Sequence, residues 1–257
     1  MCLILLAVRK HPNYKLILAA NRDEYYERRS EPPHFWEDDP HIFAGRDLVA
    51  GGTWLGITTN GRIAAVTNYR DPASIKPNAP SRGKLVSHFL ASDLDPASYV
   101  ALLRSEEDRY NGFNLILGDQ DQITWYSNRS GKETPLFPGI YGVSNHLLDT
   151  PWPKVVRAKE LFEQIILAGN NFSMESVFRL LKDQTLAPDD RLPCTGVPLE
   201  WERVLSPIFI TSPTYGTRSS TVILIDKDDR VSFVDKTFNA HPDPMSIAKF
   251  EFALEKS

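Results

Sequence analysis

Short apolar stretches alternate with polar turns along most of the chain, and several of these stretches come in pairs. The pairs are residues 2–8 with 15–20, 54–59 with 62–67, 113–118 with 123–126, and 221–225 with 231–234. The turn of the second pair is Asn60-Gly61, a dipeptide that tolerates the positive φ angles of a tight hairpin. Polar residues fill the other turns, as in most hairpin loops. The pattern predicts four hairpins and therefore antiparallel sheets.

Helical spacing of apolar residues appears between these hairpins. The segments are residues 85–90, 96–103, 153–168 and 174–181. Asp95 and Ser173 stand where helix N-caps are expected, and Gly169 follows the third segment as a C-terminal signal. Strand pairs and helices in separate blocks are typical of α+β packing, with helices on the outer faces of the sheets. No repeat or linker divides the chain, so we expect residues 1–257 to form one domain.

The composition excludes several classes of protein. Apolar residues make up 42% and charged residues 24%, which is usual for a folded globular chain. Lys and Arg number 29 against 33 Asp and Glu, a net charge of −4, so nucleic acid is not an expected partner. The first apolar run, residues 2–8, is too short for a signal peptide, and no run is long enough for a transmembrane helix. We therefore expect a cytoplasmic protein.

Common catalytic and metal-binding motifs are missing from the sequence. There is no phosphate loop, no dinucleotide-binding glycine motif and no G-x-S-x-G nucleophile elbow. The six histidines show no clustered ligand spacing, and Cys2 and Cys194 lie 192 positions apart without a nearby thiol. We expect neither a metal nor another cofactor, and we interpret Cys194 as structural or incidental.

Cys2 is the most informative residue in the sequence because it follows the initiator methionine. Removal of Met1 would leave a thiol and a free α-amine on one residue, and an amine of pKa near 8 can accept the proton of a thiol. Nucleophile and base would then belong to the same residue. The alternative is that Cys2 is a small buried hydrophobic residue at the start of an apolar strand.

The charged tetrad Asn21-Arg22-Asp23-Glu24 ends the second strand of the first hairpin. Antiparallel pairing would bring the tetrad beside Cys2. A guanidinium there would favour the thiolate, and a carboxylate would orient the ammonium or hold a substrate group. The alternative is a solvated turn with incidental ion pairs.

Several longer motifs carry a resemblance to a known family. They are Met1-Cys2, Asn21-Arg22-Asp23-Glu24, and the stretches at residues 51–56, 141–145, 148–154 and 215–218. With these motifs the chain resembles the NRDE family, which includes the eukaryotic transport and Golgi organisation proteins. That family is similar to N-terminal nucleophile (Ntn) hydrolases of the choloylglycine hydrolase and penicillin V acylase type. The resemblance implies an α+β fold, a four-layer αββα sandwich.

The resemblance also implies roles for individual residues. Cys2 matches the nucleophile and Arg22 the nearby arginine, while Asp23 or Glu24 matches the partner carboxylate. Asn68 and Asn145 resemble the two asparagines of the oxyanion site. Arg218 matches the distal arginine of the acylases. Each of the last three has an alternative: Asn68 as a strand-end turn residue, Asn145 as a cap before the helix at Pro151, and Arg218 as a cation in a turn.

Two functions follow from the resemblance. The first is hydrolysis of an amide or thioester bond of a small acylated substrate through a Cys2 acyl-enzyme. The alternative is a non-catalytic binding or trafficking protein that holds haem, a lipid or acyl-CoA in the same pocket. Either way the expected partner is a small acylated or hydrophobic ligand, and a homo-oligomer is left open. The aromatic residues Trp36, Phe43, Trp54 and Trp152 are candidates for the pocket wall.

Overall fold

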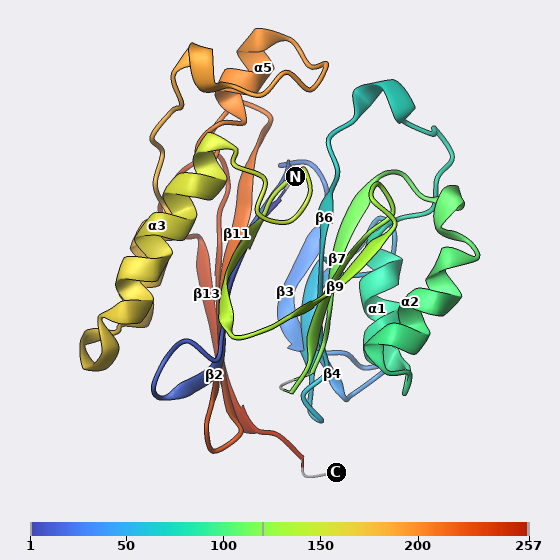
Figure 1. Cartoon of the computed structure of the whole chain (residues 1–257), viewed down its shortest axis with the longest axis vertical. Helices are drawn as coiled ribbons and strands as arrows, with labels where there is room; N and C mark the ends of the chain where they lie inside the picture. The colour runs from blue at the N-terminus through green and yellow to red at the C-terminus, as the bar shows by residue number, and fades with distance from the viewer. Residues whose placement is uncertain (1, 120, 256–257) are drawn as a thin grey trace.

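Two antiparallel sheets pack face to face in the computed structural model, which describes residues 2–119 and 121–255 (Figure 1). The first sheet has the order β10-β1-β2-β11-β12-β13, with β10 Gly139–Val143, β1 Cys2–Val8, β2 Tyr14–Tyr25, β11 Tyr215–Asp226, β12 Arg230–Thr237 and β13 Ser246–Ala253. The second runs from β3 to β9 in chain order, with β3 Ser30–Phe35, β4 Ile42–Asp47, β5 Leu55–Thr58, β6 Ile63–Asn68, β7 Phe113–Gly118, β8 Ile123–Ser127 and β9 Lys132–Leu136.

All four predicted hairpins are present: β1–β2, β5–β6, β7–β8 and β11–β12. Gly61 has a φ of 86°, as the tight turn between β5 and β6 requires. The strands β2 and β11 are longer than the apolar pattern indicates, and both continue through charged residues. As a result the tetrad at residues 21–24 lies inside a strand.

Helices cover the outer faces of both sheets (Figure 1). α1 Gly83–Ala91 and α2 Pro96–Arg104 pack on the second sheet, and α3 Pro153–Leu167 and α4 Met174–Leu181 pack on the first. Asp95 accepts a hydrogen bond from the Ser98 backbone N–H, and Ser173 accepts one from Ser176, so both predicted N-caps are formed. The predicted α+β fold and the four-layer αββα sandwich are confirmed.

The core has three layers that follow from the alternation of strand side chains. In β1, Ile4, Leu6 and Val8 face the second sheet, while Leu3, Leu5 and Ala7 face α3 and α4. A third cluster lies between the second sheet and the helices α1 and α2. Both faces of the central strands are therefore apolar, which explains why their sequences read as continuous apolar runs.

Several elements escaped the sequence pattern. They are β3, β4, β9, β10, β13, the short helix α5 Leu199–Val204, and the 3-10 turns Pro72–Ser74, Glu107–Arg109, Gly169–Asn171 and Asp189–Arg191. The edge strand β3 carries Pro32 and Pro33, which lie where its pairing with β4 is irregular, between Glu31 and His34. Within residues 2–119 and 121–255, no helix is long and apolar enough to cross a membrane.

Candidate active site

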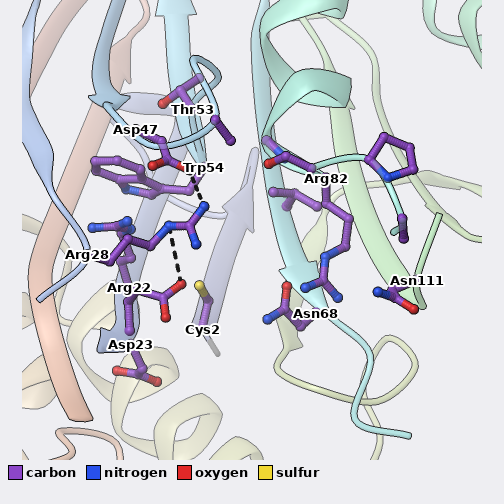
Figure 2. Close-up of a pocket in the computed structure, with 17 residues that line it drawn as sticks. Cys2, Arg22, Asp23, Arg28, Asp47, Thr53, Trp54, Asn68, Arg82 and Asn111 are labelled. Carbon is purple, nitrogen blue, oxygen red and sulfur yellow. Dashed lines mark hydrogen bonds and ion pairs between the residues drawn. The ribbon is translucent and has the colours of Figure 1, made fainter. Parts of the chain in front are cut away.

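Cys2 is the first residue of β1 and lies directly opposite Arg22 of β2 in the sheet register. Its side chain shares the strand face of Ile4 and Leu6, so it points between the two sheets. The apolar core ends there, and a cavity of about 390 Å³ takes its place. Cys2 lines this cavity, hereafter the first cavity (Figure 2). The predicted meeting of Cys2 with the tetrad is therefore observed.

Strand alternation divides the tetrad between two environments. Asn21 points toward the α3 and α4 layer, where its amide nitrogen donates 2.9 Å hydrogen bonds to the carbonyls of Leu181 and Ile208. Asp23 is buried on that same side, and its Oδ1 accepts a 2.7 Å hydrogen bond from the Thr217 hydroxyl. Figure 2 shows its carboxyl directed away from Arg28 and Trp54.

The side chains of the other two members of the tetrad lie on the opposite face of β2, and both line the first cavity, as Asp23 also does. The Arg22 guanidinium lies 4.0 Å from the centre of the Trp54 ring and donates to the Ser30 hydroxyl. Glu24 lies 3.8 Å from Arg28, which also forms a 2.6 Å ion pair with Asp47. Both carboxylates that the sequence left as alternatives line the first cavity, but their partners differ: Asp23 accepts from Thr217, and Glu24 lies beside Arg28.

The segment after β10 fastens the two sheets together beside Cys2. The Ser144 hydroxyl donates to the Cys2 carbonyl at 2.9 Å, and Thr67 donates to the Ser144 carbonyl at 2.6 Å. The Asn145 amide nitrogen donates to the Asn68 carbonyl at 3.0 Å. These bonds fix the end of β6 against the start of β1. Asn68 lines the first cavity, and Figure 2 shows its side chain facing Cys2.

The side chains of Asn145 and Arg218 donate hydrogen bonds to backbone carbonyls in this structure. Asn145 is fully buried, and its amide nitrogen is engaged by Asn68. One Arg218 nitrogen donates to the carbonyls of Tyr25, Tyr26 and Arg28, which holds the chain after β2 in place. Neither side chain is among the described residues that line the first cavity.

Arg82 is a cavity residue that the sequence analysis missed. It precedes α1 and donates to the Gly112 carbonyl at 3.0 Å. Figure 2 shows its side chain among the residues that line the first cavity. The backbone of Gly52 packs closely against this end of α1. A Cβ atom at Gly52 would lie 2.5 Å from the Gly83 carbonyl carbon, so only glycine fits there. The paired glycines at residues 51–52 were the signal that a segment approaches closely there.

Burial dominates the electrostatics around the thiol. It raises the pKa of Cys2, and the hydrogen bond from the Asp23 backbone N–H and the charge of Arg22 only partly oppose this effect. Burial also raises the pKa of Asp23, although Lys154 lies nearby. Lys154, at the start of α3, is itself buried, and its pKa falls to about 8. No motif in the sequence points to this lysine.

A second cavity of about 530 Å³ adjoins the first. Its wall includes Tyr69, Ile75 and Trp201. The segment that carries Trp201 is tied down by Arg70 and Glu202, a buried ion pair with a 2.6 Å separation. Glu202 also accepts hydrogen bonds from the Thr195 backbone N–H and hydroxyl.

The predicted aromatic wall is mostly wrong. Trp54 lines the first cavity, but Trp36 and Phe43 are buried in the core. Trp152 packs against Arg70 and His146. Cys194 is exposed. Among the described residues, no group of three or more His, Cys, Asp or Glu side chains is arranged to hold a metal ion.

Asp235 lies under the site as a buried carboxyl near Arg22. Burial raises its pKa to about 6, although the Thr221 hydroxyl donates to it at 2.6 Å. The folded state therefore binds this proton more tightly than the unfolded state, whose Asp pKa is near 3.9. The stability that protonated Asp235 contributes is present below about pH 4 and is lost as the pH rises through about 6.

Asp235→Asn should remove this pH dependence because an amide does not titrate in that range. Between pH 4 and pH 7 the parent should lose up to about 3 kcal/mol of its free energy of unfolding through Asp235, and the variant should not show this loss. Urea unfolding curves across that range provide the measurement. Parallel stability profiles for the two proteins would contradict the raised pKa.

The fold defined by these layers is that of the Ntn hydrolases. A mutant of the conjugated bile acid hydrolase from Clostridium perfringens matches with a TM-score of 0.55 and 9% sequence identity, over 100% of this chain and 99% of that chain. An identity this low shows the shared fold alone.

Sequence comparison identifies the family. Residues 1–240 match the family described as Transport and Golgi organisation 2. The transport and Golgi organization protein 2 homolog of Bos taurus is 37% identical over 99% of this chain and 100% of its own length. The homolog of Homo sapiens is 38% identical over 92% of this chain and 93% of its own. The chain belongs to this family, and the resemblance to the NRDE proteins is confirmed.

Proposed function

We propose that the protein is an Ntn-type hydrolase that cleaves an amide or thioester bond of a small acylated substrate, with Cys2 as the nucleophile. The observation that carries this proposal is the position of Cys2 at the first residue of β1, where the thiol meets a cavity between Arg22 and Asn68. The rest of the site is assigned by the contacts that each residue makes.

The proposed reaction begins with transfer of the Cys2 thiol proton to its own α-amine, which becomes free when Met1 is removed. The thiolate attacks the substrate carbonyl, the C–N or C–S bond breaks, and the leaving group takes a proton from the ammonium. Water then attacks the thioester, which releases the carboxylic acid and restores the thiol. Atoms and protons balance without a cofactor.

Each of the other residues has an assigned role. Arg22 favours the thiolate, and Asn68 donates to the carbonyl oxygen as negative charge develops there. Asp23 orients the α-amine from behind the sheet, and Glu24 positions Arg28 at the cavity. Asn145 holds Asn68, and Arg218 holds the chain after β2.

Intact mass spectrometry of the untagged protein tests the first requirement. We expect the mass of residues 2–257, since a retained Met1 would turn the α-amine of Cys2 into an amide that cannot act as a base. Incubation with a panel of acyl amides and thioesters should then add one acyl group, which peptide mapping should place on Cys2. A protein that fully retains Met1, or an acyl group on another residue, would refute the mechanism.

One observation favours ligand binding without hydrolysis. Burial raises the pKa of the Cys2 thiol, so less thiolate forms at neutral pH than at an exposed cysteine. A lipid or acyl-CoA carrier would use the same cavities without reaction at the thiol. Saturable binding of an acylated ligand, with no turnover and no acylation across the panel, is the result that this second function predicts.

A further inference from the structure

The edge strands of the two sheets differ in how open they are to pairing with another strand. An edge presents unpaired backbone N–H and C=O groups, and proteins protect such edges with prolines, irregular pairing or short strands. The edge strand β3 carries Pro32 and Pro33 where its pairing is irregular, and β9 has five residues that include Pro135. The edge strand β10 also has five residues, and Gly139 and Gly142 are two of them. These three edges are therefore poor templates for a further strand.

The fourth edge strand, β13, has none of these protections. It is labelled in Figure 1, runs over eight residues without proline or glycine, and pairs with β12 along its whole length without a register shift. Within residues 2–119 and 121–255, no strand pairs with its other side. Large apolar side chains on it are exposed, Ile247 by 59% and Phe250 by 38%. A long, regular and apolar edge strand favours pairing with another chain.

The side chains of β13 alternate between two faces. Phe250 and Phe252 face the second sheet, where their ring centres lie 4.5 Å and 6.2 Å from that of Phe43. Lys249 and Glu251 therefore lie on the outer face. Both are exposed, and they form a 3.1 Å ion pair with each other. An exposed pair of this kind contributes little to stability, so both charges can take other partners.

The order of these charges makes the strand complementary to itself. Two copies of a strand can pair antiparallel about a two-fold axis perpendicular to the sheet. An axis through Phe250 places Lys249 of each copy opposite Glu251 of the other. Opposite charges directly across two strands are stabilising, and like charges are destabilising. An axis through Lys249 or through Glu251 would instead place like charges opposite each other, so the charges select the register centred on Phe250.

The same register also covers the apolar side chains of β13. Phe250 meets its own copy at the axis, and aromatic pairs across strands are stabilising. Ile247 stands opposite Ala253, so residues 247–253 pair in both copies and nearly the whole strand is used. A lone lysine on an edge strand opposes such pairing. Here Glu251 on the same face removes that repulsion.

We propose that β13 is a homodimer interface, at which the β13 strands of two copies pair antiparallel about a two-fold axis through Phe250 and join their first sheets into one. The strands β2, β11 and β12 separate β13 from β1, which carries Cys2. No described residue of β13 lines the first or the second cavity. The dimer therefore leaves both cavities open, and the inference is independent of the proposed hydrolase function.

Sedimentation velocity of the untagged full-length protein over a wide range of concentration tests the interface. We expect a monomer–dimer equilibrium in the parent. Lys249→Glu and Glu251→Lys should each raise the dimer Kd at least about tenfold, because each creates two pairs of like charges across the axis. Lys132→Glu, at an exposed lysine of the edge strand β9, is the matched control and should leave Kd unchanged. A parent that remains monomeric at every concentration would overturn the inference.

Restoring complementary charges distinguishes this register from a general loss of folding or of solubility. The double variant Lys249→Glu with Glu251→Lys should recover the parental Kd, because each new carboxylate again faces an ammonium. A mixture of the two single variants should form a heterodimer, although each variant alone is weakened. A double variant as weak as the single ones, or a dimer that neither single substitution affects, would refute the pairing of β13.

Discussion

Replacing Cys2 by alanine is expected to lower the rate of acyl-bond hydrolysis by at least about 10³-fold while the protein remains folded. The effect is large because the substitution removes the nucleophile, and no other described thiol lines the first cavity. The measurement is kcat/KM on the best substrate of the acyl-amide and thioester panel, with purified variant and parent at equal concentration.

Cys2→Ser is the matched control for this experiment. It keeps the α-amine and nearly the size of the side chain but replaces the thiol by a less acidic hydroxyl, so intermediate activity is expected. Both variants should unfold at nearly the same temperature as the parent, because Cys2 is only partly buried and lies at a strand end. Hydrolysis at the parental rate by Cys2→Ala would eliminate the proposed mechanism.

The hairpins were predictable because each signal lies within a short stretch of sequence. Periodicity and turn residues identified β5–β6 and the helix α4, whose bounds agree with the pattern. The strands β3, β9 and β13 were not predictable in this way. Each has many exposed residues and lies at a sheet edge, where packing gives little apolar pattern to read.

Part of the candidate site was predictable, because some of its contacts join residues that are close together in the sequence. Cys2 and Arg22 come together through one local hairpin, so their proximity follows from the sequence. Arg82 reaches the cavity through the packing of α1 against the second sheet. Lys154 reaches Asp23 through the packing of α3 on the first sheet. Such contacts between layers leave no periodic signal along the chain.

The choice between Asp23 and Glu24 shows what strand register adds to a motif. Adjacent residues of a strand point to opposite faces, so the two carboxylates cannot serve the same face of the first sheet. Asp23 is held by Thr217 and lies near Lys154, while Glu24 lies beside Arg28, although both residues line the first cavity. The sequence alone does not show which alternate residues of β2 face the second sheet, and this choice is the phase of the alternation. That phase is set by Leu16 and Leu18, which face the other sheet.

Removing the charge of Glu202 is expected to lower the free energy of unfolding by about 3 kcal/mol. Glu202 and Arg70 form a buried ion pair in which the side chains are only 4% and 5% exposed. The Glu202→Gln variant keeps an acceptor for the Thr195 backbone N–H and hydroxyl, so the change isolates the charge. Urea unfolding of variant and parent gives the difference.

A double variant separates the ion pair from the general cost of mutation. Arg70→Met with Glu202→Gln removes both charges, so it should lose less stability than the sum of the two single variants. The pair also joins α5, which carries Trp201 of the second cavity, to the chain two residues after Asn68. Loss of the ion pair should therefore weaken binding of long acyl chains as well as stability. Additive losses in the double variant would show that the pair does not couple these two parts of the site.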